Sequence, residues 1–231
     1  MAETEAPKKT TLARTVKDKW RSKHWYKVRA PGLFQHAELG ETMASEPEHV
    51  LGRTLETTMQ ELGGGGDLGK AHIKLRFRVD RTTGENLAET TFIGHDLTSD
   101  YVRRLARRKR SKIDVTVNVT TKDGVQMVLK PVAVGEQRLQ SHLRTELRHR
   151  LRTILVEEAA KKTAPEYVRE MLQGDLAKAV AQGLRTLYPL KKIEIRSSTV
   201  IGTIADELPG AAEGPVPPTE PTPPVEAAPA A

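Results

Sequence analysis

The chain has 231 residues, 37% of them hydrophobic and 4% aromatic, so it can form one large domain or two small ones with a lean core. It has no cysteine, which excludes disulfides, thiolate metal sites and a cysteine nucleophile. Its net charge is +7, but residues 1–205 carry +12, because residues 206–231 hold five acids and no lysine or arginine. A body this basic indicates a polyanionic partner.

The two ends of the chain differ from its centre in composition. Residues 1–16 lack the apolar stretch of a signal peptide, and no apolar run approaches the ~18 residues of a membrane span. We therefore expect a cytoplasmic protein with no membrane partner. Residues 206–231 hold eight of the fourteen prolines among alanine and acidic residues. Such sequence buries too little apolar surface to offset chain entropy, so both ends are expected to be disordered around one domain, residues 17–205.

The segment KDKWRSKHWYKVRAP, residues 17–31, is expected to be a basic arm that binds RNA. Cations interleaved with aromatic rings suit irregular RNA, because cations follow the backbone while rings stack on unpaired bases. Alternatively, Trp25 and Tyr26 anchor this segment to the core. We expect the arm to become ordered only on RNA. Its candidate RNA-binding residues are Lys17, Lys19, Trp20, Arg21, Lys23, Lys27 and Arg29.

A glycine-rich segment resembles a nucleotide-binding loop. Gly64, Gly69 and Lys70 fit the spacing G-x-x-x-x-G-K. However, Ala71 stands where a magnesium-binding hydroxyl is needed, and an alternating strand, not a helix, is predicted to follow. We interpret the segment as a loop between two strands; a nucleotide-hydrolysing enzyme is the disfavoured alternative.

Strict alternation of apolar and polar residues predicts the strands. In HIKLRFRV, residues 72–79, every second side chain is apolar and the intervening ones are basic or histidine. Two further alternating runs flank the turn Lys122-Asp123-Gly124 and predict a hairpin. The strands are expected at 52–59, 72–79, 113–121, 125–134 and 191–201.

A second basic segment, YVRRLARRKRSK, is predicted to form a helix from Thr98 or Ser99 to about Lys112. Seven cations with no acid among them repel one another along such a helix. RNA phosphates would offset this repulsion, and arginine binds them in a bidentate, planar manner. The candidate RNA-binding residues are Arg103, Arg104, Arg107, Arg108, Lys109, Arg110 and Lys112.

Leucines at every fourth position predict a long helix within residues 136–162, and further helices are expected from Thr163 and from 175 to 187. Outward arginines of the long helix either contact RNA or are simply structural; they are Arg138, Arg144, Arg148, Arg150 and Arg152. The fold class is therefore α+β, an antiparallel sheet or open β-barrel packed by helices.

No catalytic constellation accompanies these elements. The sequence contains no His-Glu-x-x-His pair and no Gly-x-Ser-x-Gly elbow. We expect no enzyme activity, no cofactor and no metal site. A basic α+β domain without catalytic motifs is typical of a component of an RNA–protein assembly.

Three groups of motifs, in this order, resemble one family: the S-one-e (S-three-a-e) small-subunit ribosomal proteins of archaea and eukaryotes. They are Trp25-Tyr26 with Ala30-Pro31, then Gly94-x-Asp96-Leu97-Thr98, then Tyr188-Pro189-Leu190. The resemblance covers about residues 15–205. The length, without large extensions, suggests an archaeal source.

The resemblance implies a structural protein on the platform of the small (30S) subunit, beside the 3′ region of 16S rRNA and near the messenger exit. Its implied partners are this rRNA and neighbouring ribosomal proteins, with messenger RNA and initiation factors as candidate further partners. An accessory factor that joins the ribosome transiently is the alternative. No family role extends to residues 206–231.

Overall fold

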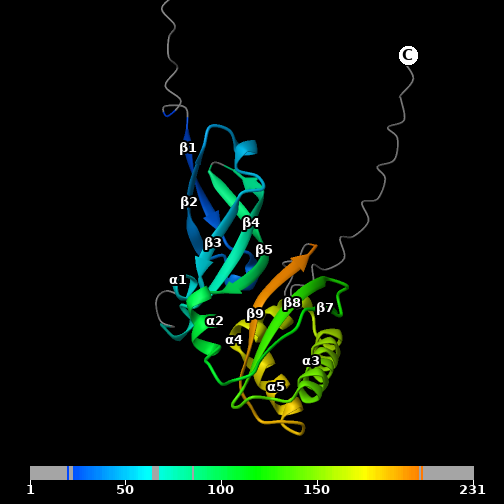
Figure 1. The fold of residues 1–231 in the computed structure, drawn as a ribbon. Coiled ribbons are helices and arrows are strands. Elements are labelled where there is room, and N and C mark those ends of the chain that lie inside the picture. The colour runs from blue at the N-terminus through cyan, green and yellow to red at the C-terminus, as the bar shows by residue number, and fades with distance from the viewer. Residues whose placement is uncertain (1–19, 21–22, 64–67, 85, 203, 205–231) are drawn as a thin grey trace, which may run out of the picture.

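A computed structural model describes residues 20, 23–63, 68–84, 86–202 and 204. These residues form an α+β fold with nine strands in one open sheet and five α-helices (Figure 1). The strands are β1 (His24–Arg29), β2 (Glu38–Ala44), β3 (Thr54–Thr58), β4 (Ile73–Thr83), β5 (Leu87–Leu97), β6 (Lys112–Asp114), β7 (Val117–Thr120), β8 (Gln126–Gly135) and β9 (Leu190–Ile201). The helices are α1 (Met59–Leu62), α2 (Ser99–Leu105), α3 (Ser141–Lys161), α4 (Ala164–Gln173) and α5 (Asp175–Leu184), and the 3-10 turns are η1 (Gly32–Phe34), η2 (Pro47–His49) and η3 (Leu68–Lys70).

Strand β5 organises the N-terminal half of the sheet. It pairs antiparallel with β4 along one edge. Its other edge pairs parallel with β1 at residues 87–89 and antiparallel with β9 at residues 94–96. Strands β2 and β3 extend this half beyond β1 and β4. The predicted α+β class is confirmed, but the sheet is mixed rather than purely antiparallel, because β1 runs in the same direction as β5.

Strand β8 organises the C-terminal half, with β9 on one edge and β6 and β7 on the other. The predicted hairpin between β7 and β8 is confirmed. The strand expected over 113–121 is interrupted, however, at Val115 and Thr116. The Val115 N–H donates to the Pro131 carbonyl at 3.3 Å. Pro131 has no N–H to return the bond, so the ladder breaks here.

The two halves of the sheet meet where β5 lies beside β9. Three residue pairs form this junction: Gly94 with Thr199, His95 with Ser198, and Asp96 with Ser197. His95 is 3% exposed, and its ring Nδ1 lies 2.6 Å from Ser198 Oγ, while its Nε2 donates to the Ile195 carbonyl at 2.9 Å. A short ladder and a buried side-chain network therefore hold the halves together.

Helices α3, α4 and α5 cover the C-terminal half and close the larger apolar core (Figure 1). Their predicted positions are confirmed, although α5 ends at Leu184 rather than at 187. Of the predicted leucine stripe, Leu147, Leu151 and Leu155 are buried within α3, and Leu139 is buried just before the helix begins. Helix α4 begins at the capping-box pair Thr163 and Glu166, in which the Thr163 N–H donates to the Glu166 carboxylate at 3.2 Å and one terminal backbone donor is satisfied. A smaller core lies between strands of the N-terminal half.

The contact between α3 and α5 depends on a glycine. An alanine Cβ at Gly183 would lie 2.7 Å from Ile154 Cδ1. We expect Gly183→Ala to destabilise the protein by about 1 kcal/mol, because overpacking exceeds the gain in helix propensity. Adding Ile154→Val removes the clashing methyl and should restore stability, measured by urea unfolding. If the loss of unfolding free energy in the double variant equals the sum of the losses in the two single variants, this packing is contradicted.

The glycine-rich segment lies in the connection between two neighbouring antiparallel strands, β3 and β4. Gly64 lies outside the described residues, whereas Lys70 ends η3 and is followed by β4 from Ile73. A strand and not a helix follows the lysine, so the chain lacks here the helix N-terminus whose backbone amides and dipole would bind phosphates. The interpretation as a loop between strands is confirmed, and the nucleotide-binding alternative has no structural basis.

Candidate RNA-binding surface

The first predicted segment is in part a strand of the sheet. Lys17, Lys19 and Arg21 lie outside the described residues. Residues 24–29 form β1, which is paired with both β2 and β5, and ordering of the arm on RNA stays a prediction. Tyr26 is 6% exposed and Trp25 is 56% exposed. Tyr26 therefore anchors the strand as expected, whereas Trp25 faces outward, and its stacking on RNA bases stays a prediction.

The outer face of β1 carries cations beside exposed rings. Lys27 and Arg29 are exposed on the same face as Trp25, because alternate residues of a strand share a face. Trp20 is 66% exposed, and the Lys23 Nζ lies 3.9 Å from its ring centroid. Exposed rings next to cations offer stacking platforms for unpaired bases.

The second predicted segment is a short helix followed by a turn. Helix α2 ends at Leu105, so the helix expected to continue to Lys112 is wrong in its second half. Continuing the helix would place Arg103 beside Arg107 and Arg104 beside Arg108, which are repulsive pairs. The chain instead turns and enters β6, whose first residue, Lys112, pairs with Val134.

Ser111 fixes the end of this turn against the start of α3. Its N–H donates to the Gln137 carbonyl at 3.2 Å, and its own carbonyl accepts from Gly135 at 2.9 Å. Its hydroxyl accepts from the Leu139 N–H at 2.8 Å. Lys109 adopts a left-handed backbone with φ of 65°. The turn is thus held in place while Arg107, Arg108 and Lys109 remain exposed.

Acidic neighbours neutralise two of the seven predicted cations. Arg104 pairs with Asp100 at 2.6 Å, and Lys112 pairs with Asp114 at 3.0 Å. The other five make no ion pair with any acid in the described part of the chain; they are Arg103, Arg107, Arg108, Lys109 and Arg110. Arg103 of α2 and the four cations of the turn therefore form a basic site that attracts anions.

Two lysines that the sequence reasoning missed complete this site. Lys191 and Lys192 of β9 line a pocket of about 210 Å³ together with Arg104, Arg107 and Arg110. In the sequence these lysines are visible only as a Lys-Lys pair at the start of a predicted strand, about eighty residues from the arginines.

Lys192 is held by hydrogen bonds within this site. Its Nζ donates to the Tyr101 hydroxyl at 2.5 Å and lies 3.2 Å from Glu194. The hydrogen bond to Tyr101, together with the one to Glu194, raises the pKa of Lys192 above its usual range. Lys192 therefore stays charged at neutral pH.

The two predicted segments do not form one patch. Arg29 of β1 lies beside Glu89, near the start of β5, whereas α2 follows the other end of β5 at Leu97 (Figure 1). At about 3.3 Å per residue, this length of strand spans about 26 Å. A partner that binds both segments must extend along the sheet.

Comparison with known proteins identifies the family. The sequence profile of the ribosomal S3Ae family matches residues 11–203 of this chain. The chain belongs to this family.

Archaeal small-subunit ribosomal proteins are similar to the chain over most of their length. The small ribosomal subunit protein eS1 of Methanobrevibacter smithii is 39% identical over 193 residues, which is 84% of this chain and 98% of that protein. The proteins of the same name from Methanothermobacter thermautotrophicus and Aeropyrum pernix are 38% and 37% identical, over 81% and 80% of this chain and 95% and 87% of those proteins. The expected family is confirmed.

Membership of the S3Ae family makes the chain a structural protein of the small ribosomal subunit and not an enzyme. Its location is therefore the ribosome of the cytoplasm. In the described part of the chain, no helix is long and apolar enough to cross a membrane, and no group of three or more acidic or histidine side chains is arranged to hold a metal ion.

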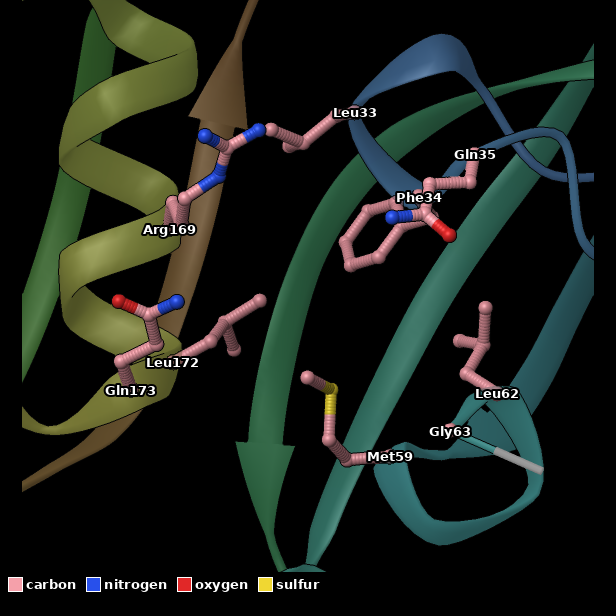
Figure 2. Close-up of a pocket in the computed structure, with 9 residues that line it drawn as sticks. All are labelled: Leu33, Phe34, Gln35, Met59, Leu62, Gly63, Arg169, Leu172 and Gln173. Carbon is pink, nitrogen blue, oxygen red and sulfur yellow. The ribbon is translucent and has the colours of Figure 1, made fainter. Parts of the chain in front are cut away.

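An apolar pocket of about 450 Å³ lies between α4, η1 and α1 (Figure 2). Figure 2 shows Leu172 and Met59 pointing into this space, with Phe34 above them and Arg169 at the rim. Among the described residues, those that line the pocket include no acid, histidine, hydroxyl or thiol.

Proposed function

We propose that the chain binds 16S rRNA on the platform of the small subunit through the turn that follows α2. The observation that carries this proposal is the basic pocket, where Arg107 and Arg110 of the turn face Lys191 and Lys192 of β9. Cations brought together from two distant parts of the chain repel one another, and RNA phosphates offset that repulsion.

The chemistry of the pocket favours recognition of backbone and shape over base sequence. Arginine guanidinium groups bind phosphate oxygens in a bidentate manner, and the lysines act as point charges. The exposed rings of Trp20 and Trp25 are, by this proposal, the stacking contacts to unpaired bases. Phosphate contacts then set the position of the protein on the RNA.

The place on the platform, beside the 3′ region of 16S rRNA and near the messenger exit, rests on the family resemblance. The proposal that neighbouring ribosomal proteins, messenger RNA and initiation factors are partners also rests on the family resemblance. Crosslinking in salt-washed subunits tests the place, because a transient accessory factor held by exposed phosphate contacts washes off. Recovery of the protein in the supernatant would favour the accessory factor.

The RNA-binding role is tested by removing charge from the pocket. We expect Arg107→Ala/Arg110→Ala to lower the slope of log affinity against log salt by about 1 for each lost phosphate contact. The measurement is a salt titration of binding between the full chain and an RNA of the 16S 3′ region. The control, Arg169→Ala/Arg185→Ala, removes two exposed cations elsewhere and should keep the wild-type slope. Equal slopes in the two variants would refute the role of the turn.

A further inference from the structure

A second basic pocket, of about 430 Å³, lies farther along the same edge of the sheet. Its wall includes Val115 and Thr116, where the ladder between β6 and β8 is interrupted opposite Pro131. Four cations from three elements reach it: Lys130 from β8, Arg148 and Arg152 from α3, and Arg196 from β9.

These four cations have no internal counter-charge. None of them makes an ion pair or a side-chain hydrogen bond with another residue in the described ranges. Asp114 is the single acid among the lining residues, and its carboxylate lies 3.0 Å from Lys112 Nζ. Arg148 and Arg152 are also one helical turn apart, which is a repulsive spacing. The pocket therefore favours an anionic occupant.

The two basic pockets are neighbours along β6 and β8. Val134, which lines the first pocket, pairs with Lys112, and Val132, which lines the second, pairs with Asp114. Two residues of strand separate these pairs by about 7 Å. Two acids lie between the pockets, Asp114 of β6 and Glu194 of β9, and each is paired with a lysine: Asp114 with Lys112 at 3.0 Å, and Glu194 with Lys192 at 3.2 Å.

We propose that the second pocket binds the sugar–phosphate backbone of the same RNA that occupies the first, so that the RNA crosses the edge strand β6. This inference rests on the proposed function. The pocket offers three guanidinium groups, which suit phosphate oxygens, and no aromatic ring for stacking, which favours backbone over bases. Continuity with the first pocket favours RNA over an acidic protein segment, because one polyanion then satisfies both groups of cations.

The test compares two pairs of arginines. Arg148→Ala/Arg152→Ala removes two cations from the pocket, whereas the control, Arg169→Ala/Arg185→Ala, removes two exposed cations that do not line it. With the full chain and the same RNA as above, we expect the pocket variant to bind about tenfold more weakly at 0.15 M salt. Its salt slope should fall by about 1 for each lost contact, while the control stays within twofold of wild type. Circular dichroism and thermal unfolding establish that both variants fold.

The outcomes separate this inference from the proposed function. If the pocket variant binds like wild type while Arg107→Ala/Arg110→Ala loses affinity, the second pocket is not an RNA site and the first remains one. If neither variant loses affinity, both proposals fail. Polyglutamate serves as the competing probe: a pocket variant that loses polyglutamate binding but keeps its RNA affinity would assign the pocket to an acidic protein segment and overturn the inference.

Discussion

Replacing Gly94 by alanine is expected to destabilise the protein by about 3 kcal/mol or more, because the new methyl group has no space. An ideal Cβ at this position lies 2.1 Å from the Ser198 carbonyl oxygen and 2.9 Å from its carbon. Both atoms belong to the backbone of β9, so no side-chain rotation relieves the clash. Gly94 also pairs with Arg76 on the other edge of β5, which prevents the strand from moving away.

The clash falls on the junction that joins the two halves of the sheet, so its effect should be global. For a chain of this size, 3 kcal/mol corresponds to a fall in Tm of roughly 6–12 °C. The matched control is Gly63→Ala, which follows α1 at a φ of −79° and whose Cβ meets nothing closer than 3.5 Å. Urea unfolding of the two variants decides the matter. Equal stability of Gly94→Ala and the control would mean that β5 and β9 are not in close contact.

Periodic burial explains why much of the fold was predictable. In β4, Ile73, Leu75 and Phe77 are buried as alternate residues, and in α3 the buried leucines recur every fourth residue. Each pattern arises because one side of a single helix or strand faces the core. It can therefore be recognised without knowing which element packs against that side. The capping box that begins α4 is similarly local.

Other elements depend on partners that the local pattern does not identify. Strand β2 has the sequence ELGETMA, with one fully buried residue, and it becomes a strand by pairing with β1. Residues 106–111 are almost all polar, so their sequence shows no hydrophobic periodicity that would distinguish an exposed helix from an exposed turn. Their conformation is set by Ser111, whose contacts lie more than twenty residues away along the chain.

The candidate RNA site was predictable only in part, for the same reason. A run of cations such as residues 103–110 is visible in the sequence, and so are the arginines of the long helix. Their companions, Lys191 and Arg196, are distant in sequence and reach the pockets only because β9 pairs with β8. Clusters of cations in the sequence therefore identify some of the residues that line each pocket. The cations that come from β9 are identified only by the order of the strands.

Acidification below about pH 6.5 is expected to destabilise the protein through His95. Burial is the main cause that lowers the pKa of His95 below its usual value, and the charge of Arg76 acts in the same direction. The Ile195 carbonyl and the carboxylates of Asp96 and Glu194 oppose this effect without reversing it. In the unfolded chain a histidine takes up its proton near pH 6.5. Below this pH the unfolded state binds more protons, so the stability that neutral His95 provides is present above pH 6.5 and is lost as the pH falls.

The hydrogen bonds of His95 explain why the neutral ring is required. A carbonyl only accepts, so Nε2 carries the proton that goes to Ile195, and Nδ1 is left to accept from the Ser198 hydroxyl. A second proton on Nδ1 would face that hydroxyl, which also accepts from the His95 N–H at 3.1 Å. The hydroxyl hydrogen would then need another acceptor in a buried site, so protonation disturbs the junction as well as charging it.

The variant His95→Gln separates this effect from the general acid response. Its amide can still donate to the Ile195 carbonyl, but it does not titrate, so stability should fall less between pH 7 and pH 5 than in wild type. Burial also lowers the pKa of His72, so a smaller slope remains in the single variant and decreases further in His72→Gln/His95→Gln. The control is His142→Gln, an exposed position on α3. Urea unfolding at several pH values gives the slopes, and a wild-type slope in His95→Gln would exclude the buried ring as the source of the acid sensitivity.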